Sequence, residues 1–559
     1  MEPVSRVENP MQEATKMQPM ADQPLTLESG SWGRPLEESF TDKLAKILPD
    51  YVAGRRWFRA KTRTIRCIEI EDAFAIEGSE AHLLILKIGY ADGGAEEYIL
   101  PVAMAAGEGQ ERVEIIARLI FQNGEAGIVY SALEDETFRT ALLNAIVRQI
   151  GIEGRNGMLI ASCTSALSER SGAAAMSKLT SFVSKAEQSN SSIIYDNRYI
   201  LKLFRKLEAG INPDVEIGQF LTEHRFAHTP AALGSLEYRD KRDEEVRAAG
   251  ILQQFVPNRG DAWKFTLDCL GESFAKALAR KRPPPERWTE HPLGLIGQEI
   301  PSEVRSFIGT YLESAALLGK RTAEMHTVLA DQNGGPDFKP ESFTAADGNR
   351  LHTDLIGQAD MAFELLRRKQ AVLTGRVAER ARELLRIEHS VTERFTAIRD
   401  HPVSAMRIRH HGDYHLGQVL YSGHDFMIID FEGEPARALT ERRAKALAMR
   451  DVAGMIRSFQ YAAFAALFGQ VPGVPSEPEA ASLVETWAAA WNAYVSSTFL
   501  RAYFEQARDQ LFVPAGWQER RILLDAFLLQ KALYEVAYEL NNRPDWLAIP
   551  LRGILTLIG

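Results

Sequence analysis

Stretches in which apolar and polar residues alternate occupy much of the first 150 residues, and a period of two residues is typical of strands with one buried face. Phe40 to Leu48 instead has apolar residues at helical spacing. A further helix is expected from Glu134 onward, and strands are predicted at Ile65 to Ile70, His82 to Ile88, Glu97 to Ala103 and Gly127 to Ser131. This region has the pattern of an antiparallel sheet backed by a helix.

Beyond residue 259 the apolar positions recur mainly at helical spacing. They predict helices over about 264–280, 307–329, 351–372, 375–399, 479–509 and 517–541. We therefore expect an α+β fold in which sheet-rich segments precede a mainly helical lobe.

Length and composition narrow the class of protein. The chain has 559 residues, 45% of them hydrophobic and 25% charged, which is enough for two or three packed units. Residues 1 to about 35 have no periodic apolar positions and are expected to form a disordered leader. No run of eighteen apolar residues and no signal-peptide pattern occurs, so we expect a cytoplasmic protein without a membrane partner.

Charge and cysteine content argue against nucleic-acid binding, disulfides and structural zinc. The formal charge of −10 provides no basic face for nucleic acid. Cys67, Cys163 and Cys269 lie far apart in the sequence without a CxxC pair, which argues against disulfides and structural zinc. Binding of a small ligand such as a nucleotide, or catalysis, is therefore expected at a local constellation of side chains.

The densest such constellation begins at residues 410–418, His-His-Gly-Asp-Tyr-His-Leu-Gly-Gln. After a predicted β-hairpin it continues at residues 427–435, Met-Ile-Ile-Asp-Phe-Glu-Gly-Glu-Pro. Kinase-like folds transfer a phosphoryl group with one aspartate that accepts the hydroxyl proton, and with an amide and a second aspartate that hold Mg²⁺. Asp413 is predicted to take the first role, and Gln418 and Asp430 the second. Either triplet alone also occurs by chance in solvated loops, so the interpretation depends on their order and spacing.

A second group of candidates, earlier in the chain, predicts a site for ATP. Ser189, Asn190 and Ser191 open an apolar strand where a glycine-rich loop is usual, and their small side chains let backbone amides approach phosphate oxygens. Lys202 lies near the end of the next strand, after a polar turn.

A lone lysine on a strand is usually a surface residue, and Glu216 is what changes this interpretation. It lies on an early turn of a helix that opens at Asn212 or Pro213, from which it is expected to pair with Lys202 and hold the ammonium on the phosphates. The strand from Ile251 ends at a proline turn, where kinases place the hinge that binds adenine. Its adenine-binding candidates are Gln254, Phe255 and Val256.

These stretches resemble the maltokinase family, bacterial ATP-dependent sugar kinases related to aminoglycoside and choline kinases. The resemblance covers about residues 38–559 and includes Arg-Arg-Trp-Phe-Arg-Ala-Lys at 55–61, Asn-Pro-Asp-Val-Glu-Ile-Gly-Gln-Phe-Leu at 212–221 and Arg-Asp-Val-Ala-Gly-Met-Ile-Arg-Ser-Phe at 450–459. Gln418, where most relatives of these kinases carry Asn, is typical of maltokinases.

The resemblance implies a two-lobed, protein-kinase-like (aminoglycoside phosphotransferase-like) fold with an N-terminal cap. The expected parts are a leader at 1–35, a cap subdomain at 36–150, a nucleotide lobe and hinge at 151–258, and a helical catalytic lobe at 259–559. The implied reaction uses ATP and Mg²⁺ to phosphorylate the anomeric hydroxyl of maltose. Maltose 1-phosphate would then serve α-glucan (glycogen) synthesis from trehalose, with trehalose synthase as supplier of maltose and candidate partner.

The predicted sugar site lies on the helix at 517–541. Lys531, Tyr534 and Tyr538 fall on one stripe of this helix, so that an ammonium and two rings face the same direction. By spacing alone, two core tyrosines and a lysine reaching toward solvent would be the simpler interpretation. The resemblance to maltokinases implies instead that these three residues bind maltose. His411 and Asp413 complete the sugar-binding candidates.

Alternatives remain open at this point. The chain would be a kinase of another sugar or an aminosugar such as glucosamine if the pocket differs, or a catalytically silent pseudokinase that acts as a binding partner. Two isolated residues, His326 and Asp451, are expected to have structural roles, Asp451 either as a helix cap or as a brace of the catalytic loop.

Overall fold

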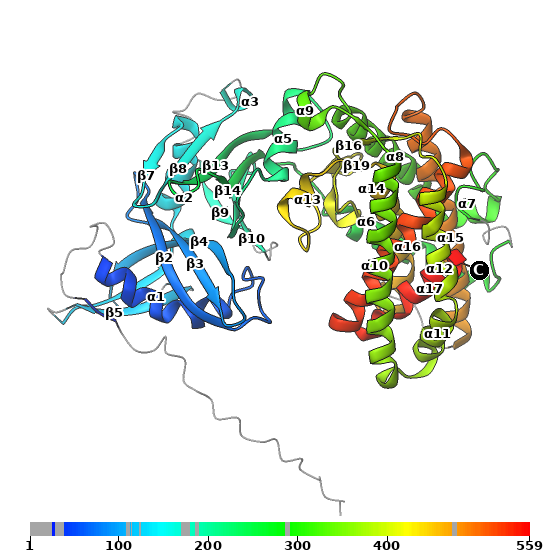
Figure 1. The fold of residues 1–559 in the computed structure, drawn as a ribbon, viewed down its shortest axis with the longest axis horizontal. Coiled ribbons are helices and arrows are strands. Elements are labelled where there is room, and N and C mark those ends of the chain that lie inside the picture. Colours follow the sequence, from blue (N-terminus) through cyan, green and yellow to red (C-terminus); the bar gives the residue numbers. More distant parts are fainter. Residues whose placement is uncertain are drawn as a thin grey trace, which may run out of the picture. The chain divides into compact units, whose positions relative to one another are not determined.

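The computed structural model describes residues 25–27, 38–107, 112, 114–121, 124–168, 179–184, 189–285, 291–471 and 478–558. The chain divides into two compact units, and each is described by itself. One comprises Met1–Gly210 and Leu233–Gln253, and the other comprises Ile211–Ala232 and Gln254–Gly559. Figure 1 shows strands in the first and mostly helices in the second.

The first unit contains two sheets. One has seven strands within the described residues, in the order β1 (Leu25–Leu27), β5 (Ile115–Phe121), β6 (Ala126–Ser131), β4 (Ala95–Ala106), β3 (His82–Tyr90) and β2 (Ile65–Ala75), with β12 (Lys206–Leu207) paired to β4. The helix α1 (Glu38–Ala53) packs on this sheet through Leu44, Leu48 and Val52, which are spaced four residues apart and fully buried. The predicted helix and strands are confirmed, but β1 lies inside the expected leader, and that expectation is wrong for these three residues.

The other sheet has the order β7 (Gly151–Glu153), β8 (Gly157–Cys163), β13 (Ala232–Asp240), β14 (Val246–Gln254), β11 (Tyr199–Phe204), β10 (Asn190–Tyr195) and β9 (Ser181–Val183). The helix α2 (Glu136–Arg148) belongs to the same unit, as does the short α3 (Ser165–Ser168). The predicted hairpin is β10 and β11, in which Tyr195 pairs with Tyr199. Asp196 and Asn197 both adopt positive φ at its turn, a conformation that Asp and Asn tolerate better than most residues.

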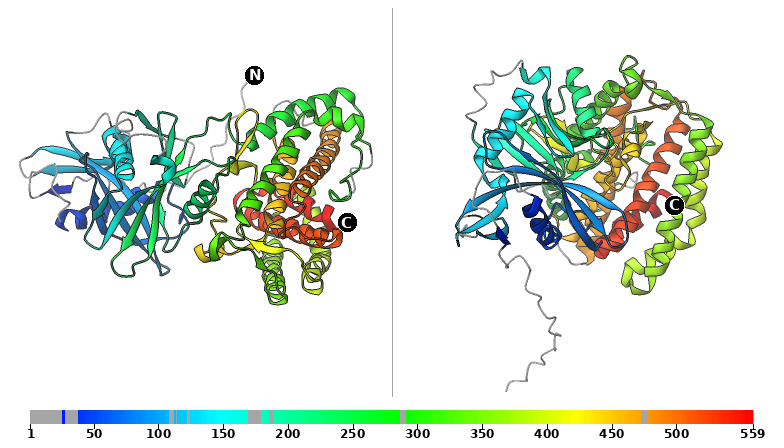
Figure 2. Two further views of the ribbon diagram at one scale, coloured as in Figure 1. Left: turned by 90° about the horizontal axis from the view of Figure 1, so that it is seen from above. Right: turned by 60° about the vertical axis from the view of Figure 1, so that its left-hand side comes forward.

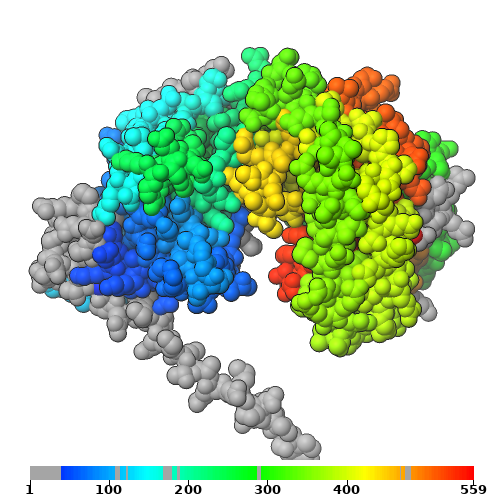
Figure 3. Space-filling model, viewed as in Figure 1, coloured from blue at the N-terminus to red at the C-terminus, as the bar shows by residue number. Residues whose placement is uncertain are grey.

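The second unit is built from helices around a large apolar core. Its helices are α5 (Pro213–Glu223), α6 (Ala262–Arg280), α7 (Ser302–Ile308), α8 (Tyr311–Leu329), α9 (Gly335–Phe338), α10 (Ala345–Lys369), α11 (Gly375–Arg386), α12 (Glu388–Asp400), α13 (Leu439–Arg443), α14 (Met449–Ala465), α15 (Pro478–Gln506), α16 (Trp517–Asn542) and α17 (Ala548–Ile558). In Figure 3 the green to yellow-green surface of α10 to α12 makes up a large part of the face of this unit that is turned to the viewer.

Two small sheets complete the second unit. One contains β15 (Glu341–Ser342), β16 (Met406–Ile408) and β19 (Ala446–Leu447), and the other is the predicted hairpin of β17 (Val419–Tyr421) and β18 (Phe426–Ile428). Helices α8 and α15 lie side by side (Figure 2). A Cβ at Gly319 would come within 2.3 Å of the Phe499 carbonyl oxygen, so only glycine permits this close approach.

Two of the predicted long helices are broken in the structure. The helix expected over 307–329 is wrong at its start, because Gly309 adopts a φ of +68° between α7 and α8. The helix expected over 375–399 divides into α11 and α12 at Ile387. None of the described helices combines the length and apolarity needed to cross a bilayer.

Candidate active site

The carboxylate of Asp413 lies against the ammonium of Lys531 on α16. Lys531 Nζ donates to Asp413 Oδ1 at 3.1 Å, and His415 Nε2 lies 3.9 Å from Oδ2. Burial works to raise the pKa of Asp413, but Lys531 and His415 lower it overall. Burial works to lower the pKa of Lys531, but Asp413 raises it overall. Both groups are therefore charged at neutral pH, as a proton-accepting carboxylate requires.

Asp451, from the first turn of α14, holds the backbone of the loop that carries Asp413. Its Oδ2 accepts the amide of His411 at 2.7 Å, and its Oδ1 accepts the amide of Gly412 at 3.0 Å. His326 Nε2 lies 3.1 Å from Oδ2, and both side chains are fully buried. Asp451 thus braces the loop that carries Asp413, and His326 supports Asp451 from the core, which confirms the structural roles expected for both.

His411 joins this loop to the end of β18. Its ring Nε2 lies 2.9 Å from the Ile429 carbonyl oxygen, and its Nδ1 accepts the amide of Asp413 at 3.4 Å. The side chain is only 1% exposed. These contacts orient Asp413 relative to the hairpin, whereas a direct contact between His411 and a sugar stays a prediction.

Gln418 and Asp430 flank the predicted β17–β18 hairpin, Gln418 directly before β17 and Asp430 two residues after the end of β18. The Ile429 amide donates to the Gln418 carbonyl oxygen at 3.0 Å. Asp430 has a φ of +66°, a left-handed conformation that costs free energy for a residue with a side chain and is concentrated at functional sites. Their role as metal ligands stays a prediction at this point.

Two further acidic groups, Asp214 and Glu432, lie beside Asp430. Carboxylate oxygens of Asp214, Asp430 and Glu432 all lie within 4.8 Å of one another. Asp214 comes from the first turn of α5, and its Oδ1 accepts the Phe431 amide at 2.9 Å. Carboxylate and amide oxygens are the ligands that Mg²⁺ prefers, so these residues fit a magnesium site. Sequence reasoning missed Asp214, although the helix start that carries it was recognised.

Glu216, also on α5, contacts two arginines of its own unit. Its Oε2 accepts from Arg409 at 2.7 Å and from Arg443 at 3.0 Å, and its Oε1 accepts from Arg443 at 2.6 Å. The predicted helix start is confirmed, since the Asn212 side chain accepts the amides of Asp214 and Val215. The predicted ion pair with Lys202 would join residues of two separately described units and stays a prediction.

The remaining nucleotide candidates occupy strands and strand ends. Asn190 and Ser191 begin β10, Ser189 directly precedes them, and Lys202 lies on β11 opposite Ser192. Gln254 ends β14, and its amide donates to the Ala231 carbonyl oxygen at 2.9 Å, while Phe255 and Val256 follow without regular structure. These positions match the predicted hairpin and strand end, and ATP binding by them stays a prediction.

The predicted sugar-binding stripe lines a cavity of about 840 Å³. The Tyr534 and Tyr538 rings are stacked with centroids 6.4 Å apart, and they are 40% and 44% exposed. Lys531 Nζ lies 5.1 Å from the centroid of the Tyr534 ring. Further charged and aromatic residues of the lining are Asp261, Trp263, Asp413, His415, Glu434, Arg457, Tyr461, Glu535, Glu539, Arg543 and Trp546. The cavity therefore begins at the predicted catalytic carboxylate and is walled by exposed aromatic rings.

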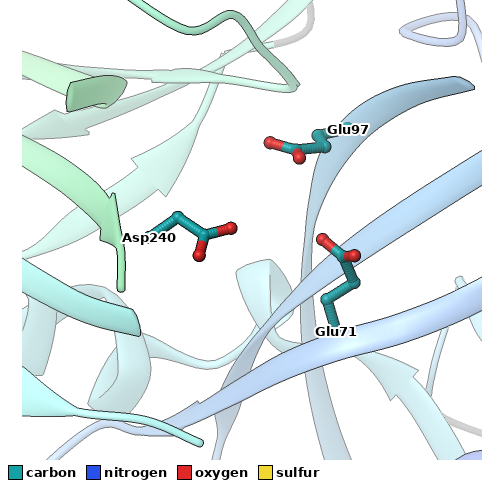
Figure 4. A group of neighbouring side chains, drawn as sticks. All are labelled: Glu71, Glu97 and Asp240. Atoms are coloured by element: carbon teal, nitrogen blue, oxygen red, sulfur yellow. The ribbon is translucent and has the colours of Figure 1, made fainter. Parts of the chain in front are cut away.

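Another group of carboxylates, in the first unit, does not have the character of a metal site. Figure 4 shows Glu71, Glu97 and Asp240 pointing toward one another from three strands. Arg242 binds both Glu71 and Asp240, Lys87 binds Glu71, and Arg247 binds Glu97 at 2.7 Å. Basic side chains thus compensate all three acids, and the network ties the two sheets of this unit together.

Comparison with known proteins adds independent information on this chain. Residues 51–135 match the maltokinase N-terminal cap domain. A glucosamine kinase from Mycolicibacterium smegmatis is 21% identical over 376 residues, which span 66% of this chain and 78% of that protein. A glucosamine kinase from Streptacidiphilus jiangxiensis is 28% identical over 375 residues, which span 66% of this chain and 72% of that protein.

Solved structures of glucosamine kinase resemble the whole chain. The structure in complex with glucosamine, ADP and inorganic phosphate has a TM-score of 0.58 at 19% identity, covering 93% of this chain and 99% of that one. A crystal form of glucosamine kinase has a TM-score of 0.59, also at 19% identity and with the same coverage. At this level of identity the likeness establishes a common fold.

Proposed function

The chain is a maltokinase-like protein with the cap domain of maltokinases and a protein-kinase-like fold, and from this premise we propose that it is an ATP-dependent kinase that phosphorylates the anomeric hydroxyl of maltose. The proposed reaction, phosphoryl transfer to a sugar, and the proposed substrate, maltose, rest on different observations. Relatives that are sugar kinases support phosphoryl transfer to a sugar, and the cavity beside Asp413 supports the choice of maltose.

The observation that carries the proposal is the Asp413–Lys531 ion pair at the head of the aromatic cavity. A sugar hydroxyl that reaches this point meets a charged carboxylate able to accept its proton. The hydroxyl oxygen then forms a bond to the γ-phosphorus of ATP while the bond from that phosphorus to the β,γ-bridging oxygen breaks. ADP departs with the electrons of the broken bond, and Asp413 retains the proton.

Magnesium fits the acidic cluster at the hairpin. Gln418, Asp430 and the neighbouring Asp214 and Glu432 would hold it, and a bound Mg²⁺ would neutralise part of the phosphate charge. On the nucleotide itself, we propose that Lys202 acts on the phosphates with Ser189, Asn190 and Ser191, while the pairing of Glu216 with Lys202 stays a prediction of the sequence. Backbone groups of Gln254, Phe255 and Val256 would bind adenine.

Size and ring chemistry of the cavity support a disaccharide. Ligand pockets usually measure about 300 to 1,000 Å³, so a cavity of about 840 Å³ has room for two sugar rings. Tyr534 and Tyr538 present exposed faces on which the apolar side of a pyranose can stack, and their hydroxyls can bond its OH groups. His411 completes the proposed sugar site.

The charge pattern of the cavity favours a neutral sugar over an aminosugar. Five acids line it, and four of them are already matched by bases, namely Asp413 by Lys531, Glu434 by Arg437, Glu535 by Arg457 and Glu539 by Arg543. The fifth, Asp261, accepts the Lys264 amide as the cap of α6. An ammonium group would have to displace one of these bases to gain a carboxylate, unless it reached Asp261 at the start of α6. Hydroxyl groups can instead bridge the existing pairs as donors and acceptors.

Glucosamine is the second candidate substrate, because two of the relatives are glucosamine kinases. Titration of maltose and of glucosamine with ATP and Mg²⁺, followed as ADP release, tests the choice. We expect kcat/KM for maltose to be at least tenfold higher. A higher kcat/KM for glucosamine would make glucosamine the proposed substrate. If no ADP is released with either sugar, the pseudokinase alternative is favoured.

The proposed metabolic role of the product rests only on the resemblance to maltokinases. Maltose 1-phosphate made by this chain would feed α-glucan (glycogen) synthesis, with trehalose synthase supplying maltose from trehalose. Co-purification of the two proteins at equal molar amounts would support a physical complex between them.

A further inference from the structure

The first turns of α5 contact both ends of the stretch that carries the catalytic and metal-binding candidates, residues 409–443, which we term the catalytic segment. Arg409 stands at its beginning, four residues before Asp413, and Arg443 stands at its end. Both arginines donate to the carboxylate of Glu216. Asp214, two residues earlier, accepts the Phe431 amide from the middle of the segment.

The contacts between Glu216 and the two arginines are shielded from water. The side chains of Arg409, Glu216 and Arg443 are 2%, 12% and 25% exposed. Two guanidinium groups share the one carboxylate of Glu216 in this poorly solvated position. Removing the negative charge would take this partner from both arginines and leave Arg443 with the exposed Asp337, which is costly where access to solvent is low.

Apolar contacts hold the same helix in the second unit. The Phe220 ring of α5 stacks on Phe338 of α9, with centroids 3.6 Å apart and an interplanar angle of 5°. The Arg409 guanidinium lies 5.3 Å from the centroid of the Phe338 ring. Asp337, next to Phe338, lies 3.4 Å from Arg443. Helix α5 is therefore fixed to the catalytic segment by charge and by ring stacking together.

We infer that Glu216 is a positioning residue that fixes both ends of the catalytic segment through Arg409 and Arg443, and so sets where Asp413 stands relative to Asp430. This inference rests on the proposed kinase function, because the geometry it maintains is that of phosphoryl transfer. It goes beyond a pairing of Glu216 with Lys202, since its partners are two arginines that bracket the catalytic residues. Small displacements of reacting groups cost large factors in rate, so a loosened segment should lower kcat.

The test is a pair of double-mutant cycles with Glu216→Gln, Arg443→Gln and Lys202→Met. We expect Glu216→Gln and Arg443→Gln each to lower kcat at least tenfold while KM for ATP stays within twofold. In the Glu216→Gln/Arg443→Gln double variant the two reductions in kcat should not multiply, because both substitutions remove the same contact. In the Glu216→Gln/Lys202→Met double variant the two effects should multiply, because the substitutions remove independent contacts. Arg443→Lys should recover part of the rate.

The opposite pattern overturns the inference. Suppose that Glu216→Gln raises KM for ATP, that its effect multiplies with that of Arg443→Gln, and that it does not multiply with that of Lys202→Met. Glu216 then acts by pairing with Lys202. Glu388→Gln is the matched control, because Glu388 pairs with Arg367 away from this segment, and it should leave all constants unchanged.

Amide hydrogen exchange separates failure of this inference from failure of the proposed function. In Glu216→Gln and in Arg443→Gln we expect faster exchange across residues 409–418 and no change across residues 190–204. Unchanged exchange at 409–418 in both variants overturns the inference whether or not the enzyme is active. If exchange at 409–418 is faster in both variants but the wild-type chain phosphorylates no sugar, the anchoring contact is supported, whereas the kinase function and the positioning role in it are refuted.

Discussion

Replacing Lys531 by Met should move the acidic limb of the pH–rate profile to higher pH. In the wild-type chain Lys531 helps to keep the pKa of Asp413 below its ordinary value, so the carboxylate stays deprotonated down to low pH. Without the Lys531 ammonium, less positive charge counteracts the effect of burial, so the pKa of Asp413 rises. Since the proton acceptor works only when deprotonated, activity is retained above the new pKa and lost as pH falls through it.

The size of the shift follows from the geometry of the pair. Unit charges 3.1 Å apart interact by about 5 kcal/mol at an effective dielectric constant of about 20. The two side chains are 30% and 20% exposed, so solvent screens the interaction. We expect about 1.4 to 2.7 kcal/mol to remain, which corresponds to a shift of about 1 to 2 pH units.

The assay is kcat/KM for the sugar at saturating ATP, measured from pH 4.5 to 8.5 by ADP release. Lys531→Arg is the control, since it keeps a positive charge at this position and should shift the limb much less. An acidic limb that stays in place in Lys531→Met, in a protein that remains folded by circular dichroism, would refute the claim that this pair sets the ionisation of Asp413.

Three further predictions concern single residues. Asp413→Asn should abolish turnover while ATP–Mg²⁺ still binds, because the metal ligands are untouched; activity within tenfold of the wild type would refute the assignment. Lys202→Met should weaken the response to ATP and leave sugar affinity nearly unchanged, and an unaltered ATP titration would make Lys202 a structural residue only. Tyr538→Ala should raise KM for maltose at least tenfold, about 1.4 kcal/mol, without changing KM for ATP, and a change within twofold would remove α16 from the sugar site.

Local patterns in the sequence predicted the elements that local physics decides. Asn212 caps α5 because its side chain accepts the helix's orphan amides, and the Asp196–Asn197 turn closes the β10–β11 hairpin as expected. The fold class was also accessible: the chain has an α+β fold that it shares with glucosamine kinase structures, and residues 51–135 match the maltokinase N-terminal cap domain.

Partners that come from distant parts of the chain could not be predicted in the same way. Asp214 joins Asp430 only because α5 packs on the hairpin, more than two hundred positions further along the sequence. Glu216 has the residue type and spacing expected for a partner of Lys202, yet the contacts in its own unit are with Arg409 and Arg443. Charge pairing depends on tertiary geometry, which residue spacing does not specify.

Breaks in regular structure were the other source of error. The apolar spacing of 307–329 continues through Gly309, but the positive φ of this residue ends α7 before α8 begins. In β1, three residues of the expected leader pair in parallel with β5, because a strand edge can recruit a short segment that has no periodicity of its own.

Identification of the reaction product tests the central claim most directly. The wild-type chain should be incubated with ATP, Mg²⁺ and maltose, and the product examined by ³¹P and ¹H NMR. We predict one new phosphomonoester coupled to the anomeric proton of the reducing glucose unit, formed in equal amount to ADP and absent with Asp413→Asn. A phosphate on any other carbon of maltose, or no phosphorylated maltose at all when glucosamine is converted, would contradict the proposed function.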